Sequence, residues 1–199
     1  MKINKQKAWD YFILVARFLL GWTFLRYGFG KLMDGQFGLT EAELHTSVQE
    51  LSTFKLSWYL FDMQPFKAFI GISQIICGFL LIINRTAILG AFMFLPIVAT
   101  ILIIDITFLK MPGFYTRLGA YILLDLLILY HYKDRMLVIW AAVWQDVQTK
   151  FSFPAWRYLI LPIMAIILEI ALAMPKAIYH LITEPESFQQ LYQQIVALF

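Results

Sequence analysis

Five long apolar stretches constrain most strongly what this chain can fold into. They cover residues 10–32, 66–84, 86–109, 115–132 and 157–179. Each is close to the roughly 20 helical residues that cross a hydrocarbon core of about 30 Å. Their apolar residues run without the alternation typical of a barrel strand, so helices are expected throughout.

Composition points to the same class of protein. The chain has 61% hydrophobic and only 15% charged residues, whereas soluble domains carry about 25% charged residues. A single soluble core of this size cannot bury so much apolar surface. We therefore expect an all-α fold, an integral membrane helical bundle.

Two further segments have the composition of helices at the membrane surface. Residues 39–63 have acidic residues near their start and apolar residues at mixed helical spacing. In residues 136–151, Trp140 and Trp144 are four apart and share a helical face, and tryptophan is enriched at headgroup depth. The second segment is predicted to lie on the membrane surface, and the alternative is a sixth, short span.

The distribution of Lys and Arg predicts the orientation. The N-terminal tail, the turn near Arg85 and the loop after the fourth span are basic, whereas residues 33–65 hold one lysine and five acidic residues. Because cytoplasmic loops carry the excess of Lys and Arg, the N-terminus is expected in the cytoplasm. Five spans then place the C-terminus on the extracytoplasmic side.

These assignments divide the chain into three parts. Residues 1–135 form a four-helix unit with an extracytoplasmic loop at 33–65. Residues 136–156 are an amphipathic interfacial segment, and residues 157–199 are a fifth transmembrane helix with an extracytoplasmic tail.

Arg17 and Asp125 are the first candidates for a functional contact. Ionisable groups at membrane depth are expensive and tend to pair inside a bundle. Both residues lie at a similar distance from the cytoplasmic end of their spans, so we predict an Arg17–Asp125 ion pair, with Tyr130, His131 or Tyr132 as a cap. The alternative is that Arg17 extends to cytoplasmic headgroups.

Polar residues nearer the outer end predict a second site, an outer polar cluster or ligand-binding site. Its members are Arg26, Tyr27, Lys31, Gln74, Asp105, Arg117 and Glu169. Arg26 is expected to pair inward, whereas Lys31 and Arg117 could instead extend to outer headgroups. Gln74 needs a hydrogen-bond partner in apolar surroundings. Inward pairs of this kind could also serve only helix assembly.

Small residues recur on the first two spans. At 3.6 residues per turn, Gly21 and Gly28 lie within about 40° of Arg17, and Gly71 and Gly78 share a face of the second span. Small residues let membrane helices approach closely, so these four glycines are predicted helix-packing positions.

Several classes of chemistry find no support in the residues. Cys77 is the only cysteine, so the chain cannot form an internal disulfide, and it is expected to be a packing residue. No histidine and carboxylate spacing predicts a metal or haem site. No Lys/Arg run predicts nucleic-acid binding. No catalytic residue is predicted.

Two motifs carry a family resemblance. "RFLLGWTFLRYGFGKL" (17–32) resembles the first helix of the DoxX-like membrane proteins, with an Arg, a Gly, an aromatic-rich stretch and an ending G-x-x-K-L. "GISQIICGFLLIINRTAILGA" (71–91) is similar to the second helix of that family, although Gln74 stands where the family has an acidic residue. The resemblance covers residues 15–135.

The resemblance implies a four-helix bundle in a bacterial cytoplasmic membrane. Relatives are associated with quinone-linked thiosulfate oxidation, with thiol-redox maintenance or with assembly of other membrane proteins. Our first functional hypothesis is a non-catalytic accessory protein, a subunit or assembly factor whose partner is a membrane or envelope protein or a second copy.

Two alternatives stay open at this point. The outer polar cluster could hold the head of a quinone or of a bound lipid in a redox system, although no cofactor is certain. Asp105, Asp125 and Glu169 could instead belong to a small transporter or proton pathway.

Overall fold

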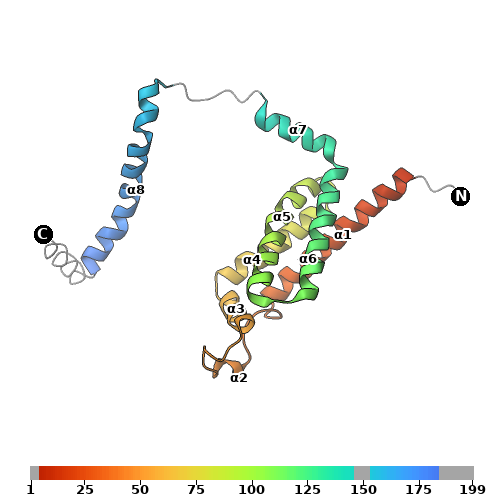
Figure 1. Ribbon diagram of the computed structural model, residues 1–199, viewed down its shortest axis with the longest axis horizontal. Coiled ribbons are helices and arrows are strands. Elements are labelled where there is room, and N and C mark those ends of the chain that lie inside the picture. The colour runs from red at the N-terminus through yellow and green to blue at the C-terminus, as the bar shows by residue number, and fades with distance from the viewer. Residues whose placement is uncertain (1–4, 146–152, 184–199) are drawn as a thin grey trace. The chain divides into compact units, whose positions relative to one another are not determined.

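A computed structural model describes residues 5–145 and 153–183, and every regular element in these ranges is a helix (Figure 1). Contacts divide the chain into two units, residues 1–145 and 146–199, and each is described by itself. The described part of the second unit is helix α8 (Ala155–Thr183). The expectation of an all-α fold is confirmed.

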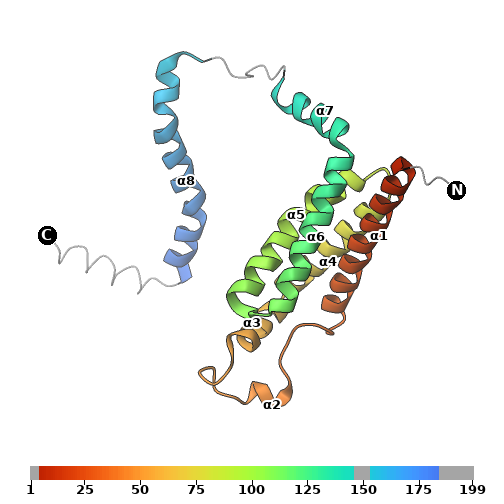
Figure 2. The same ribbon diagram turned by 45° about the vertical axis from the view of Figure 1, so that its right-hand side comes forward.

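The first unit contains a four-helix bundle (Figure 2). Its helices are α1 (Lys5–Leu32), α4 (Phe66–Ile82), α5 (Ala87–Ile104) and α6 (Pro112–His131). Helices α4 and α6 each pack against both α1 and α5, so α1 and α5 occupy opposite corners. The buried core contains Ile13, Leu20, Phe24, Leu81, Phe94, Val98, Leu118 and Ile128.

The contact between α1 and α4 depends on glycine. A β-carbon placed on Gly21 would lie 2.8 Å from the carbonyl oxygen of Gly78, and one on Gly28 would lie 2.6 Å from that of Gly71. Real β-carbons do not approach backbone atoms so closely. All four glycines singled out in the sequence therefore lie where the two backbones touch, within one chain.

The helices have the length and composition of membrane spans. Within the described residues, four are long and apolar enough, namely Lys5–Leu32, Ala87–Leu109, Pro112–His131 and Ala155–Pro175. Helix α4 reaches the length and hydropathy of a span only when it is taken together with α3 (Thr53–Asp62). The two helices are bent by 83° relative to each other. The five predicted spans thus correspond to α1, α4, α5 with its extension, α6 and α8.

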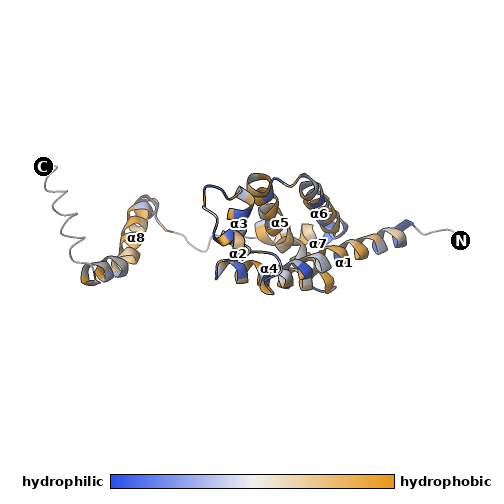
Figure 3. Ribbon diagram, turned by 90° about the horizontal axis from the view of Figure 1, so that it is seen from below, coloured by the Kyte–Doolittle hydropathy of each residue, from blue (hydrophilic) through white to orange (hydrophobic). Residues whose placement is uncertain are grey.

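The outer surface of the bundle is apolar. Phe69, Leu89 and Ile103 are each about three-fifths or more exposed, at 69%, 59% and 64%, and hydrophobic colour covers much of the ribbon in Figure 3. A soluble protein rarely leaves so many large apolar side chains in water. The bilayer is therefore the solvent of these helices.

One end of the bundle is covered by short helices. Residues 39–63 contain α2 (Glu41–Leu44) and α3. Helix α5 continues into a π-helix, η1 (Asp105–Leu109), and the residue that caps it, Lys110, has a φ of 53°. Helix α3 packs against both η1 and α4, so the segment predicted to be interfacial lies over this end of the bundle.

Helix α7 (Lys133–Trp144) follows α6 directly and lies in the first unit. The rings of Trp140 and Trp144 are 5.7 Å apart, on one face as expected. Twelve residues of helix extend about 18 Å, too short for a span of about 30 Å. Residues 146–152 of the predicted segment and the tail after 183 lie outside the described residues.

Candidate polar sites of the bundle

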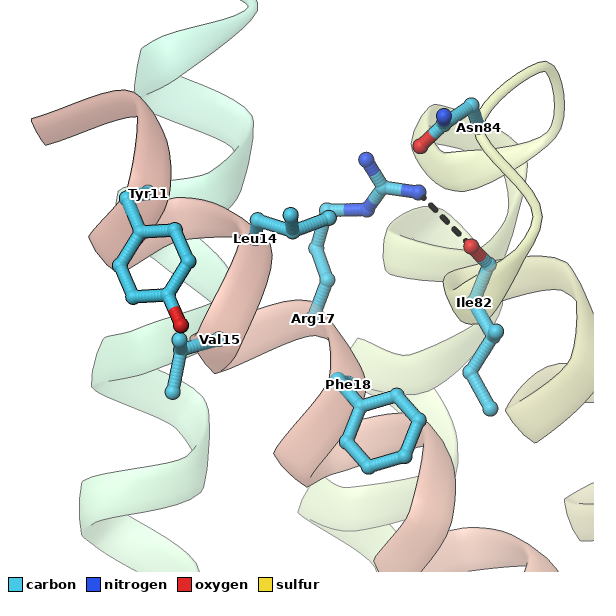
Figure 4. A pocket seen from close by; sticks show the side chains of 7 residues that line it. All are labelled: Tyr11, Leu14, Val15, Arg17, Phe18, Ile82 and Asn84. Carbon is cyan, nitrogen blue, oxygen red and sulfur yellow. Dashed lines mark hydrogen bonds between the residues drawn. The ribbon is translucent and has the colours of Figure 1, made fainter. Parts of the chain in front are cut away.

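Arg17 extends from α1 toward the turn after α4 (Figure 4). Its Nε donates to the Leu81 carbonyl at 3.0 Å, Nη2 to the Ile82 carbonyl at 3.1 Å, and Nη1 to the Tyr132 hydroxyl at 3.2 Å. The residue is only 4% exposed. One guanidinium therefore joins α1, the end of α4 and the end of α6.

The structure does not form the predicted Arg17–Asp125 ion pair. The last carbonyls of a helix lack intrahelical partners and carry partial negative charge, and those of α4 lie within reach of Arg17. The guanidinium therefore turns toward this helix end rather than deeper toward Asp125. Of the three capping candidates, Tyr132 supplies a contact.

Asp125 and Gln74 project into the bundle interior from α6 and α4. Both are fully buried, and none of their side-chain oxygen or nitrogen atoms has a hydrogen-bond partner among the described residues. Buried polar groups are normally satisfied. Within the described residues, these two side chains are exceptions to this rule.

Cys77 lies one turn from Gln74 on α4. It is fully buried, and its thiol donates to the Gly90 carbonyl on α5 at 3.5 Å. This is the environment of a small packing residue.

Asp105 occupies a different place, at the start of η1. It is fully buried, and its carboxylate oxygens make no hydrogen bond of normal geometry within the described part of the chain. Because η1 packs against α3, α5 and α6, Asp105 lies beneath the short helices that cover the bundle end. Its position in the sequence predicts that Asp105 lies near this end of the bundle, but it does not predict the π-helix.

Lys31 is enclosed rather than extended toward headgroups. It is 5% exposed, and its Nζ donates to the Gln36 side-chain oxygen at 2.7 Å. The same ammonium lies 5.6 Å from the ring centre of Tyr27 and 5.1 Å from that of Phe37. Two aromatic faces at this distance stabilise a cation, so Tyr27 and Lys31 form part of one small site.

Arg26 and Arg117 are exposed on the outside of the bundle. The rings of Tyr27 and Phe114, 6.5 Å apart, bring α1 and α6 together beside them. Arg26 lies opposite Arg17 around α1, and the face of Arg17 is the one packed against α4. Arg26 therefore faces outward, which corrects the expected inward pairing.

The predicted outer polar cluster is consequently not one site. Gln74 lies in the interior and Asp105 under α3, whereas Lys31 is enclosed near the bundle end. Glu169 lies on α8, in the second unit. Position along the chain predicts the depth of each residue but not the direction in which its side chain leaves the helix.

Lys67, at the start of α4, was missed by sequence reasoning. It is 5% exposed, and its Nζ contacts Asp62 Oδ1 at 2.6 Å and Asp34 Oδ1. It thus joins the segment after α1 to the end of α3. The acidic excess of residues 33–65 was the available signal, since a buried lysine beside them has two partners at hand.

A cleft of about 430 Å³ opens at the same end of the bundle. Its lining comprises Asp34, Phe37, Gly38, Leu39, Leu44, Tyr59, Asp62 and Met63. Both carboxylate partners of Lys67 are among them.

Glu43 and Lys55 connect α2 to α3. The Glu43 carboxylate lies 2.7 Å from Lys55 Nζ and accepts a bond from the Thr40 N–H at 2.8 Å. The hydrogen bond from Lys55, followed by those from Thr40, lowers the pKa of Glu43 to about 2. This carboxylate is therefore charged throughout the neutral range.

These features together define a multi-pass helical membrane protein. Residues 12–106 match the DoxX family model, which confirms the DoxX-like resemblance read from the sequence for this part of the chain. The match runs from α1 to η1.

A curated relative is the uncharacterized protein YwoB of Bacillus subtilis (strain 168), which is 36% identical over 93 residues. The match covers 46% of this chain and 59% of the relative, so the chain spans about three-fifths of the length of that protein. No solved structure matches the chain.

Proposed function

We propose that this protein is a non-catalytic accessory module of a membrane or envelope complex, as a subunit or an assembly factor. The observation behind the proposal is the exposure of Arg26 on α1 and Arg117 on α6, two helices that the Tyr27–Phe114 contact joins. Charged groups on the outside of a membrane bundle are costly unless they reach headgroups or meet another polar group. A partner that presents a carboxylate to this surface fits it best.

We further place the protein in the cytoplasmic membrane of a bacterium, with the N-terminus in the cytoplasm. The loop of residues 33–65 holds five acidic residues and one lysine, whereas the N-terminal tail, the turn near Arg85 and the loop after α6 are basic. This asymmetry supports the orientation. The partner surface around Arg26 and Arg117 then lies toward the outer side.

The test is gentle detergent extraction from native membrane, followed by mass spectrometry of what co-purifies. The double variant R26Q/R117Q is compared with R85Q, which changes an exposed arginine at the opposite end. We expect a stoichiometric partner with wild type and R85Q, and about tenfold less with the double variant, as the loss of charge-assisted contacts predicts. Equal recovery with the double variant, or wild type recovered alone, contradicts the proposal.

A second candidate function is a proton pathway, and the unpartnered carboxyl of Asp125 favours it. Ionisable groups inside membrane bundles recur in proton relays. In proteoliposomes with an imposed proton gradient, D125N would then abolish proton flux and leave the folded fraction unchanged. Flux that is equal for wild type, D125N and empty liposomes excludes this candidate.

Quinone binding is an alternative supported by the enclosure of Lys31 between Tyr27 and Phe37. An ammonium and two aromatic rings suit the carbonyl and ring of a quinone head. A lipid extract of purified wild type should then contain quinone, which K31M should lose and K55M should retain. Electrons would come from a partner, because the chain has no cofactor fingerprint of its own.

A further inference from the structure

We propose that the groove beside Arg17 binds the phosphate of an anionic phospholipid, at the basic end of the bundle. The groove lies between α1 and the turn after α4 (Figure 4). This site is separate from the surface around Arg26 and Arg117. The inference therefore does not depend on the accessory role.

The first argument is that the Arg17 charge has no counterion among the described residues. Its three hydrogen bonds go to two carbonyl oxygens and one hydroxyl, all of them neutral. Within residues 5–145 and 153–183, no ion pair includes it. A charge that is 96% removed from solvent requires compensation, and an anion can supply it.

The second argument is the unused donor capacity of the guanidinium. An arginine has five N–H groups, and three are engaged. The remaining two are one each on Nη1 and Nη2, the pair of nitrogens whose fork matches phosphate geometry. Arginine is suited to phosphate for this reason, more than lysine.

The third argument is the shape and chemistry of the groove. It measures about 430 Å³, within the range of roughly 300–1,000 Å³ typical of ligand sites. Arg17 and Asn84 form a polar end, and the walls are Tyr11, Leu14, Val15, Phe18 and Ile82. Because Leu14 and Phe18 are also exposed on the bundle surface, the apolar walls continue toward the surrounding lipid. A phospholipid matches this arrangement, because its polar headgroup can meet the polar end and its acyl chain can follow the apolar walls.

The fourth argument is the charge around the groove, which selects among lipids. Arg17 contacts the ends of α4 and α6, and the rings of Trp9 and His131 are 6.3 Å apart. The start of α1 and the ends of α4 and α6 are therefore close together. At this end the described cations Lys5, Lys7, Arg85, Lys133 and Arg135 outnumber the described carboxylates, Asp10 and Asp134. Basic sites between membrane helices attract anionic headgroups, which favours a net anionic lipid over a zwitterionic one.

The test measures thermal unfolding of the purified full chain in detergent. Phosphatidylglycerol, phosphatidylcholine or inorganic phosphate is titrated into wild type, V15W, F12W and R17Q. V15W fills the groove from a half-exposed position without touching the bonds of Arg17. F12W is the matched control, because Phe12 is similarly exposed on α1 but does not line the groove.

We expect phosphatidylglycerol to raise the unfolding temperature of wild type and F12W, with phosphatidylcholine having a much smaller effect. V15W should keep the unfolding temperature without lipid but bind phosphatidylglycerol about tenfold more weakly, as should R17Q if it folds. Equal effects of the two lipids, or unchanged binding by V15W, would overturn the proposal. A shift with inorganic phosphate alone would also overturn it, by assigning the site to a free anion.

Discussion

Gly21 of α1 and Gly78 of α4 face each other so closely that a β-carbon on either would lie 2.7–2.8 Å from the carbonyl oxygen of the other. A similar relationship recurs about two turns away, where β-carbons on Gly28 and Gly71 would lie 2.6 and 3.2 Å from the carbonyl oxygen of the other. In the bilayer such close packing takes the place of the hydrophobic effect as the force between helices. Substitution of these glycines therefore tests the fold rather than a partner contact.

Replacing Gly78 by Ala should destabilise the bundle. The added methyl group meets backbone at 2.7 Å, so α1 and α4 must separate, at a cost of about 1–3 kcal/mol. Thermal unfolding in detergent measures it. The control is G30A, also in a helix, where a β-carbon meets nothing within 4 Å and alanine should be neutral or stabilise by about 0.5–1 kcal/mol. Equal loss in both variants would contradict the close contact.

Arg17 and Asp125 should behave independently. Since Arg17 bonds to carbonyls and Tyr132 rather than to Asp125, the stability changes of R17Q and D125N should add within about 0.5 kcal/mol in a double-mutant cycle. Chemical or thermal unfolding of the four proteins gives the coupling energy. A coupling energy above about 1 kcal/mol would indicate that the two side chains interact, as the ion pair expected from the sequence requires.

Tyr132 offers a third measurement. In Y132F the Nη1 group of Arg17 loses an acceptor that lies 3.2 Å away, with a cost of about 1 kcal/mol. Y130F is the matched control, because Tyr130 lies two residues earlier, in α6, and is exposed. Unfolding temperatures of the two variants in detergent should differ, with Y132F the lower. Identical temperatures would mean that this hydrogen bond does not stabilise the bundle.

Lys67 should hold residues 33–65 against the bundle. In K67M, Asp34 and Asp62 lose their shared cation. Asp34 is largely exposed and Asp62 partly exposed, so the cost should be modest, about 1 kcal/mol. Such a change raises the open population about fivefold, which chymotrypsin cleavage of the segment can detect. K133M, at the other end of the bundle, should leave the cleavage rate unchanged.

The Glu43–Lys55 contact predicts a pH dependence. Because the pKa of Glu43 is lowered from 4.5 to about 2, its contribution to stability is fully present above pH 4.5 and is lost as the pH falls through about 2. The ratio of pepsin cleavage in wild type to that in E43Q should therefore rise toward one across this window. A ratio that stays constant would mean that the contact does not hold α2.

Orientation can be tested through the single cysteine. Cys77 is fully buried, so added cysteines can be labelled against a low background. With the N-terminus in the cytoplasm, a membrane-impermeant maleimide should label S47C in intact cells but label R85C only after lysis. The reverse pattern would invert the assignment.

The architecture was accessible from the sequence because length and hydropathy alone identify membrane helices. All five predicted spans correspond to helices, and the four glycines lie where backbones touch. Depth along the membrane could also be read, as for Lys31 and Asp105 near one end. These properties depend on position along a helix, which the sequence states directly.

The partners of the charged residues were not accessible in the same way. Arg17 bonds to the carbonyls of Leu81 and Ile82, and every residue has a carbonyl, so no side-chain pattern signals such an acceptor. Arg26 faces outward because α4 takes the opposite side of α1, a choice set by glycine packing. Lys67 contacts Asp34 and Asp62 at a point where α3 is bent by 83° from α4. Contacts of this kind depend on the path of the backbone.

The aromatic contact at the centre of the bundle has a consequence for permeation. The rings of Phe24 and Phe94, from opposite corners, have centroids 4.2 Å apart and are fully buried. They close the axis between α1 and α5, so a continuous water-filled pore through the four helices requires both rings to move. At this level the interior between α1 and α5 is therefore filled by two aromatic side chains.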